Sequence, residues 1–319
     1  MKKNYFVRNG MMALAALTLI GSATSCKKKD DPAPNTLVEV ASSAGLTSLV
    51  ATVEAAGLTN TLRGPGPFTV FGPTNAAFTA AAIPANTPVA TLQSVLLYHV
   101  FDGKVLAAAV PTTLTAIASK NATTDTLYVK RVGSDVFVNG QRVTTANAEA
   151  SNGVAHVIGR VLIPAGGRNI VQVAVAAAPA LDSLVRAVTL ASAGTAAGSA
   201  DNIAEVLSNI NCATVFAPTN QAFTDLLAQL GVTSLSQVSV TTLRQVLRHH
   251  VVAGARVFSN DVAPGNVATA SGTSATIAIS GGNATIKGNA ANSATATIVA
   301  TDIMAKNGVV HLINKVILP

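Results

Sequence analysis

Histidine is the residue type in this chain best suited to acid–base catalysis or metal binding, and the chain holds five of them. They are His99, His156, His249, His250 and His311. A bound metal ion usually needs three or four convergent ligands. The sequence shows no His-x-x-x-His pair, no Cys-x-x-Cys pair and no acidic loop of the calcium-binding type. We therefore expect no metal site and no cofactor.

The sequence supports nucleophilic catalysis as little as it supports a metal site. The sequence has no Gly-x-Ser-x-Gly turn, and residues 64–67 (Gly-Pro-Gly-Pro) offer few backbone N–H donors for a phosphate. Cys212 has no neighbouring His or Asp and resembles a small buried apolar residue. We expect a protein that is not an enzyme. A hydrolase remains an alternative, because carboxylates distant in sequence can converge in space, or a serine could lie near His156 or His311.

The composition predicts packed cores and argues against nucleic acid as a partner. Hydrophobic residues make up 49% of the 319 residues and charged residues 11%, which is unlike a disordered chain. Trp is absent and aromatic residues are 4%, so platforms for base stacking are scarce. The net charge is +7, yet no long basic block occurs beyond Lys27 to Lys29.

The N-terminus has the pattern of an export signal. A basic start and a short apolar run precede small residues that end at Cys26, so we expect a signal peptide over residues 1–25. Cys26 resembles the lipidated cysteine of a bacterial lipoprotein, although Ala23 stands where a Leu is usual. Residues 29–31 (Lys-Asp-Asp) resemble the surface-export signal of Bacteroidetes lipoproteins. Residues 26–35 then form a lipid-anchored tether. The alternative is an ordinary cleaved signal with a chance cysteine.

The rest of the chain is an internal repeat. Residues 68–78 (FTVFGPTNAAF) recur as residues 213–223 (ATVFAPTNQAF), and residues 152–164 (NGVAHVIGRVLIP) recur as residues 307–319 (NGVVHLINKVILP). Between them, residues 95–100 (VLLYHV) recur as 246–251 (VLRHHV). The order is kept, which predicts two copies of one domain over residues 36–164 and 168–319. The linker of residues 165–167 is short.

These motifs imply the elements that position them. Residues 68–71 form an apolar strand that ends at Pro73, and Thr74 and Asn75 offer N-cap side chains for a helix. Leu92, Val95, Leu96 and His99 recur at helical spacing. Residues 154–163 alternate as a strand after an Asn-Gly turn, and hairpins are expected at residues 139–140 and 281–282. Early helices and later hairpins indicate an α+β domain.

Together these motifs resemble the fasciclin (FAS1) domain. The resemblance implies two tandem FAS1-like domains, each a β-sheet wedge with helices packed at one side, and surface or secreted proteins used in adhesion rather than catalysis. It also implies a set of signature residues whose role is mainly structural. In the first copy they are Phe71, Pro73, Thr74, Asn75, Phe78, Tyr98, His99, Asn152, Gly153 and His156, and in the second Phe216, Pro218, Thr219, Asn220, Phe223, His249, His250, Asn307, Gly308 and His311. His249 departs from the family's Tyr.

The resemblance also suggests interaction residues. In animal members an Asp-Ile pair before the last motif has been proposed as an integrin contact, and Asp302-Ile303 matches it, whereas the first copy has Asn147-Ala148. A turn-capping role for Asp302 is the alternative. Arg244 and Arg248 are spaced four apart and predict either a basic patch or a solvated helix face.

We therefore expect an outer-membrane lipoprotein, exposed at the surface, that is held in the membrane through Cys26. It would act as a non-catalytic adhesion or interaction module for an extracellular protein or polysaccharide. The alternative is a polysaccharide- or small-ligand-binding lipoprotein of an uptake or assembly system. The pairs Asp125-Thr126 and Asp182-Ser183 weakly resemble O-glycosylation acceptors of Bacteroidetes envelope proteins.

Overall fold

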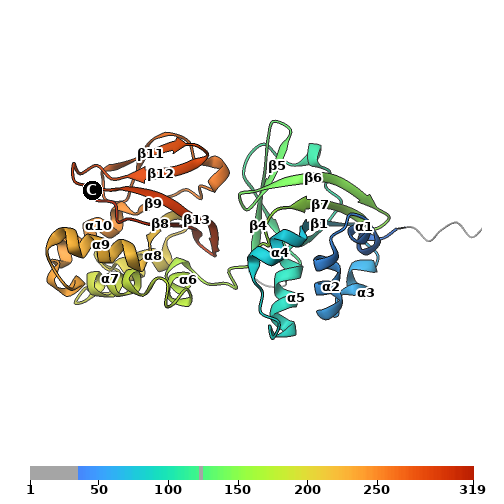
Figure 1. Ribbon diagram of the computed structural model, residues 1–319, viewed down its shortest axis with the longest axis horizontal. Coiled ribbons are helices and arrows are strands. Elements are labelled where there is room, and N and C mark those ends of the chain that lie inside the picture. The colour runs from blue at the N-terminus through green and yellow to red at the C-terminus, as the bar shows by residue number, and fades with distance from the viewer. Residues whose placement is uncertain (1–34, 122–124) are drawn as a thin grey trace, which may run out of the picture. The chain divides into compact units, whose positions relative to one another are not determined.

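The two sequence repeats fold as two α+β domains whose elements follow the same order (Figure 1). The computed structural model describes residues 35–121 and 125–319. Within each domain, the helices lie on one side of a seven-stranded mixed sheet. This architecture confirms the predicted fold class.

The elements of the first domain come in the order predicted, with helices before hairpins. They are α1 (Leu37–Ser43), α2 (Thr47–Ala55), α3 (Thr59–Arg63), β1 (Phe68–Pro73), α4 (Asn75–Ala81), α5 (Val89–Tyr98), β2 (Val100–Asp102), a 3₁₀ turn η1 (Ala107–Ala109), β3 (Thr115–Ala118), β4 (Thr126–Val132), β5 (Asp135–Val138), β6 (Gln141–Ala150) and β7 (Gly153–Ile158).

The second domain repeats this order, and α7, α8 and α9 are longer than their counterparts α2, α3 and α4. Its elements are α6 (Ile170–Ala176), α7 (Asp182–Ser192), α8 (Ile203–Asn209), β8 (Ala213–Pro218), α9 (Asn220–Leu230), η2 (Leu235–Gln237), α10 (Val240–His249), β9 (Val251–Ala253), η3 (Ser259–Asp261), β10 (Gly265–Ala268), β11 (Ser274–Ser280), β12 (Asn283–Lys287), β13 (Thr295–Ala305) and β14 (Gly308–Ile313). A connection of residues 193–202 lies between α7 and α8.

The strand that follows each Asn-Gly turn is central to its sheet. The strand order is β2-β1-β7-β6-β5-β4-β3 in the first domain and β9-β8-β14-β13-β12-β11-β10 in the second. The pairs β1–β7 and β8–β14 are parallel, and the other pairs are antiparallel. All six residues of β7 are buried, because both faces of this strand are covered.

The prediction of an alternating strand through Ile163 is wrong in its extent. Strand β7 ends at Ile158, a turn follows, and Arg160 is exposed. Val161 and Leu162 are buried although they lie outside any strand. The alternation in the sequence beyond Ile158 therefore reflects side chains that pack from an irregular segment.

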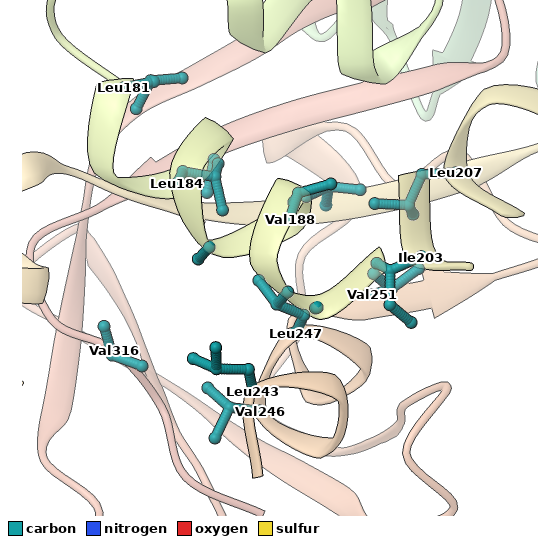
Figure 2. Close-up of a cluster of buried hydrophobic side chains, with 14 of the residues drawn as sticks. Leu181, Leu184, Val188, Ile203, Leu207, Leu243, Val246, Leu247, Val251 and Val316 are labelled. Atoms are coloured by element: carbon teal, nitrogen blue, oxygen red, sulfur yellow. The ribbon is translucent and has the colours of Figure 1, made fainter. Parts of the chain in front are cut away.

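Each domain has one hydrophobic cluster under its helices and another enclosed by its hairpins. In the first domain, Ala155 and Val157 of β7 belong to the cluster under the helices, and Ile158 belongs to the cluster enclosed by the hairpins. Strands β6 and β13 carry register shifts where they pair with β7 and β14. Successive side chains of a strand point to opposite faces of the sheet, so β7 contributes to both clusters. Figure 2 shows the helix-side cluster of the second domain.

Local sequence signals account for the turns. Thr74 and Thr219 cap α4 and α9 by accepting hydrogen bonds from the backbone N–H groups of Ala77 and Ala222. Asn139 and Gly140 have positive φ values of 45° and 78°, as a two-residue hairpin with a type I′ turn requires. Both predicted hairpins are confirmed. In the described part of the chain, no helix has the length and apolar character needed to cross a membrane.

Candidate functional site

The signature histidines of the Tyr-His motif join the end of a helix to the last segment of their domain. His99 Nδ1 lies 2.7 Å from the carbonyl oxygen of Val95, and its Nε2 accepts a hydrogen bond of 2.9 Å from the N–H of Leu162. His250 repeats this with the carbonyl oxygen of Val246 at 2.7 Å and the N–H of Ile317 at 3.1 Å. Because an N–H group can only donate, Nε2 must be unprotonated, and each ring is neutral.

The histidines of the last motif hold a different pair of backbone groups. His156 Nε2 lies 2.9 Å from the carbonyl oxygen of Val105, and its Nδ1 accepts a hydrogen bond of 3.3 Å from the N–H of Asn147. His311 does the same with Val257 and Asp302. The rings lie 5.6 and 5.7 Å from those of Phe71 and Phe216 in neighbouring strands. Burial lowers the pKa of both histidines.

The residue that precedes the histidine of the Tyr-His motif is Tyr98 in the first domain and His249 in the second, and the two have different hydrogen-bond partners. The Tyr98 hydroxyl donates to the carbonyl oxygen of Thr126 at 2.9 Å and accepts from Asn139 Nδ2 at 2.8 Å. Burial raises the pKa of this hydroxyl. In the second domain, His249 replaces Tyr98, and its Nδ1 lies within 3.1 Å of the hydroxyl oxygens of Thr269, Ser271 and Thr273. Among the described residues, His249 Nε2 has no hydrogen-bond partner.

The signature asparagines lie between segments that are far apart in sequence. Asn307 Oδ1 accepts from the N–H of Ile170 at 2.9 Å, and its Nδ2 donates to the carbonyl oxygens of Leu207, Ser208 and Ile210 at 2.9–3.3 Å. One side chain thus supplies hydrogen-bond partners to the backbone groups at the start of α6 and at the end of α8. Asn152 does the same with Leu37, Leu62 and Gly64. Asn75 and Asn220 bind Ser48 and Ser183 at the starts of α2 and α7.

Replacement of Asn307 by Ala should destabilise the second domain by about 3 kcal/mol, because it leaves several buried backbone groups without partners. Urea unfolding followed by amide hydrogen exchange in β14 measures this loss. Asn283→Ala is the matched control, because Asn283 is exposed and should change the free energy of unfolding by less than about 0.5 kcal/mol. A similar small effect of Asn307→Ala would contradict the structural role of this side chain.

The predicted interaction pair Asp302-Ile303 lies at the register shift of β13. Asp302 has a φ of 61°, and its carboxylate accepts hydrogen bonds from Ser259, one of them from the backbone N–H at 2.8 Å. Ile303 is half-buried against the helix-side cluster. In the first domain, Asn147 has the same φ region at 62° and accepts from the N–H of Ala107 at 2.8 Å. Both residues therefore cap a 3₁₀ turn, and the partner contact of Asp302 and Ile303 stays a prediction.

The two arginines of α10 lie against the loop between α7 and α8. Arg244 donates to the carbonyl oxygen of Ala191 at 2.8 Å, and Arg248 to that of Ala200 at 2.6 Å. Both guanidinium groups also pair with Asp201, at 3.3 and 3.0 Å. These contacts attach the loop to α10 and reduce the charge available as a basic patch. A role of Arg244 and Arg248 in partner binding stays a prediction.

Some of the remaining predicted site residues lie within the part of the chain that the structure describes, and others lie outside it. Cys26 and residues 29–31 lie outside the described residues. Cys212 is a half-buried free thiol just before β8. Thr126 begins β4, and Ser183 lies in the first turn of α7; both are half-buried. Over residues 35–121 and 125–319, no three His, Cys, Asp or Glu side chains come together as they would around a metal ion.

Sequence reasoning missed the partners of these signature residues. Asn139 was expected only as a turn residue, yet its side chain binds Tyr98 and also accepts from the N–H of Tyr128 at 2.8 Å. Asn147 was expected to be a departure from Asp302, although it has the same backbone geometry. The only signal for either was that Asn and Asp tolerate positive φ and carry an acceptor that can bind nearby backbone.

Comparison with known proteins agrees with the repeat. The family model described as "Fasciclin domain" matches residues 44–164 and 186–319. Protein sll1483 from Synechocystis sp. is 42% identical over 138 residues, which are 40% of this chain and 73% of that protein. The uncharacterized protein sll1735 from the same organism is 34% identical over 141 residues, 41% of this chain and 98% of that protein.

Longer relatives align with both domains at once. Transforming growth factor-beta-induced protein ig-h3 from Sus scrofa is 27% identical over 267 residues, and periostin from Homo sapiens is 25% identical over 273 residues. These alignments cover 81% and 83% of this chain but only 35% and 30% of the relatives, so the chain spans about a third of their length. A solved FAS1 domain pair from the insect cell adhesion molecule Fasciclin I covers 87% of this chain and 98% of its own, with a TM-score of 0.41 and 15% identity. The chain belongs to the Fasciclin family, whose domains are non-catalytic interaction modules, and it carries two of them.

Proposed function

We propose that this protein is a bacterial envelope lipoprotein that acts at the cell surface as an adhesion or interaction module. Its partner would be an extracellular protein or polysaccharide. The observation that carries the proposal is the double match to the Fasciclin domain over most of the chain. The signature side chains support it, because their polar atoms bind the domain's own backbone and leave the chemistry of recognition to exposed surfaces.

The sequence before the first domain supports the envelope location. A basic start, a short apolar run and small residues precede Cys26, and a lipidated cysteine at this point would anchor the protein. Multiple acyl chains bind a membrane stably, because each buried methylene contributes about 0.8 kcal/mol. The residues Lys29-Asp30-Asp31 favour the outer surface over the periplasm.

Protease treatment of intact cells tests this proposal. The wild-type protein should be found in the membrane fraction and should be digested, while Cys26→Ala should be released in soluble form. Cys212→Ala is the matched control: it removes the other cysteine of the chain and should leave the membrane attachment unchanged. Protection of the wild-type protein would exclude a surface role and leave a periplasmic binding function. Release of the wild-type protein would exclude the anchor.

Attachment of cells to coated surfaces tests the adhesion itself. Cells that lack the protein should attach less to matrix protein or polysaccharide, and the wild-type gene should restore attachment. Restoration by the Cys26→Ala form, which should not remain on the cell, would contradict an adhesive role of the anchored protein.

A further inference from the structure

The helix side of the second domain contains an apolar cavity of about 130 Å³. It lies between α6, α7, α8, α10 and the strands β8 and β14, and its walls include Ile170, Leu184, Val188, Leu207 and Leu247. Figure 2 shows four of these side chains, Leu184 and Val188 on α7, Leu207 on α8 and Leu247 on α10, within one hydrophobic cluster. A cavity of this size is large for a domain interior, which is normally closely packed.

The first domain offers a built-in comparison. The repeat-equivalent residues Leu37, Leu49, Val53, Leu62 and Leu96 line a space of only about 30 Å³. At two lining positions the second domain has the larger side chain, since Gly72 and Ala155 of the first are replaced by Ala217 and Val310. The side chains at these positions therefore do not account for the additional volume, and the helices are also connected differently. The connection between α6 and α7 has five residues (177–181), against three (44–46) between α1 and α2.

The walls of the cavity leave no polar group in need of a partner. His250 uses both ring nitrogens, with Val246 and Ile317, and burial lowers its pKa to about 4, so the ring is neutral. The Thr189 hydroxyl donates to the carbonyl oxygen of Val185 at 2.9 Å. Water in a cavity needs two to four polar partners, and these walls offer it almost none.

The size and position of the cavity define its ligand. An apolar cavity of about 150 Å³ accepts one benzene ring, so about 130 Å³ suits an uncharged hydrocarbon group of about six carbons. Two lining residues, Val175 and Thr189, are exposed, and they mark where the cavity reaches the surface. A polar group of the ligand could remain in water there.

We propose that this cavity binds a free small molecule through an aromatic ring or a branched aliphatic group of about six carbons. The proposal concerns the second domain alone and does not rest on the surface role proposed above. It gives the two copies of the domain different functions: the first is a packed module, and the second also binds a ligand.

Benzene is the probe for this proposal, added to the Cys26→Ala chain purified without detergent. Methyl resonances are followed by NMR. Benzene should shift the resonances of Leu184, Val188, Leu207 and Leu247, and should leave those of Leu49, Val53, Leu62 and Leu96 unchanged. Equal shifts in both domains would mean non-specific partitioning. Absence of shifts at benzene saturation would mean that no binding cavity exists. Either result overturns the proposal.

A variant that fills the cavity with a larger side chain tests whether benzene binds there. Ala204 lines the cavity from the first turn of α8, and Ala204→Leu should reduce benzene binding at least tenfold. Ala228→Leu is the control, because Ala228 lies on the exposed face of α9 and should leave binding unchanged. Ala174→Leu fills the same cavity from α6 and replaces Ala204→Leu if that variant does not fold. Undiminished binding in a folded filling variant would place the ligand elsewhere and overturn the proposal.

Discussion

Gly153→Ala is expected to unfold the first domain, with a loss of more than about 4 kcal/mol of stability. A Cβ atom on Gly153 would lie 2.1 Å from the carbonyl oxygen of Phe68 and 2.9 Å from its carbonyl carbon. Both atoms are backbone atoms of β1, which pairs with β7 in register Phe68 to Gly153. The clash cannot be relieved by a side-chain rotation, so the parallel strands at the centre of the sheet would have to separate.

Gly159→Ala provides the control from the same motif. A Cβ atom there would meet no atom within 4 Å, and the free energy of unfolding should change by less than about 0.5 kcal/mol. Amide hydrogen exchange in β1 and β7 measures both variants, with β8 and β14 as an internal reference for the second domain. Native protection of β1 in Gly153→Ala would show that the backbone can move apart cheaply and would contradict the expectation.

Acidification should destabilise both domains between about pH 6.5 and pH 4. Burial lowers the pKa of His99 and of His250 from 6.5 to about 4. The unfolded chain therefore binds more protons than the folded chain in this window. The contribution of these histidines to the free energy of unfolding is fully present above pH 6.5 and is lost as the pH falls. His99 and His250 each contribute about 3 kcal/mol to this loss, because one pKa unit corresponds to about 1.4 kcal/mol. His156 and His311, whose pKa burial also lowers, change the stability in the same direction. Protonation of Nε2 would also replace this acceptor by a donor that faces the backbone N–H of Leu162 or Ile317, so the hydrogen bond would be lost.

Urea titrations at pH 7, 5.5 and 4.5, read by hydrogen exchange in each domain, measure this dependence. His250→Gln lacks this titrating ring, so it should lower the stability of the second domain at pH 7 and reduce its pH dependence to the part that His311 contributes. The first domain, with His99 intact, should keep its full slope in the same sample. An unchanged slope in the second domain would assign its acid sensitivity to groups other than His250.

Much of the architecture followed from the sequence because it depends on local or repeated patterns. The two copies were recognised from motifs in a conserved order along the chain. Thr74 and Thr219 act as N-caps because a helix start needs an acceptor within three residues. The hairpin at Asn139-Gly140 forms because few other residue pairs tolerate two positive φ values. Each of these signals is contained in a few consecutive residues.

The structure decided what the polar signature residues bind. Asn307 contacts Ile170 and Leu207, residues 137 and 100 positions away. His99 Nε2 accepts a hydrogen bond from the backbone N–H of Leu162, 63 positions away. Asp302 and Asn147, which differ in charge, proved equivalent because both occupy the irregular turn of a bent strand.

The sequence by itself determined the family, the two domains and the order of their elements, because apolar periodicity and turn residues act over short stretches of chain. The tertiary structure alone decided that His99 and His250 are neutral, that Asp302 binds Ser259, and that the cavity of about 130 Å³ in the second domain is larger than the space at the same position of the first. The reason is physical: a proton's location, a carboxylate's partner and an internal volume all depend on groups that the folded backbone brings together from distant parts of the sequence.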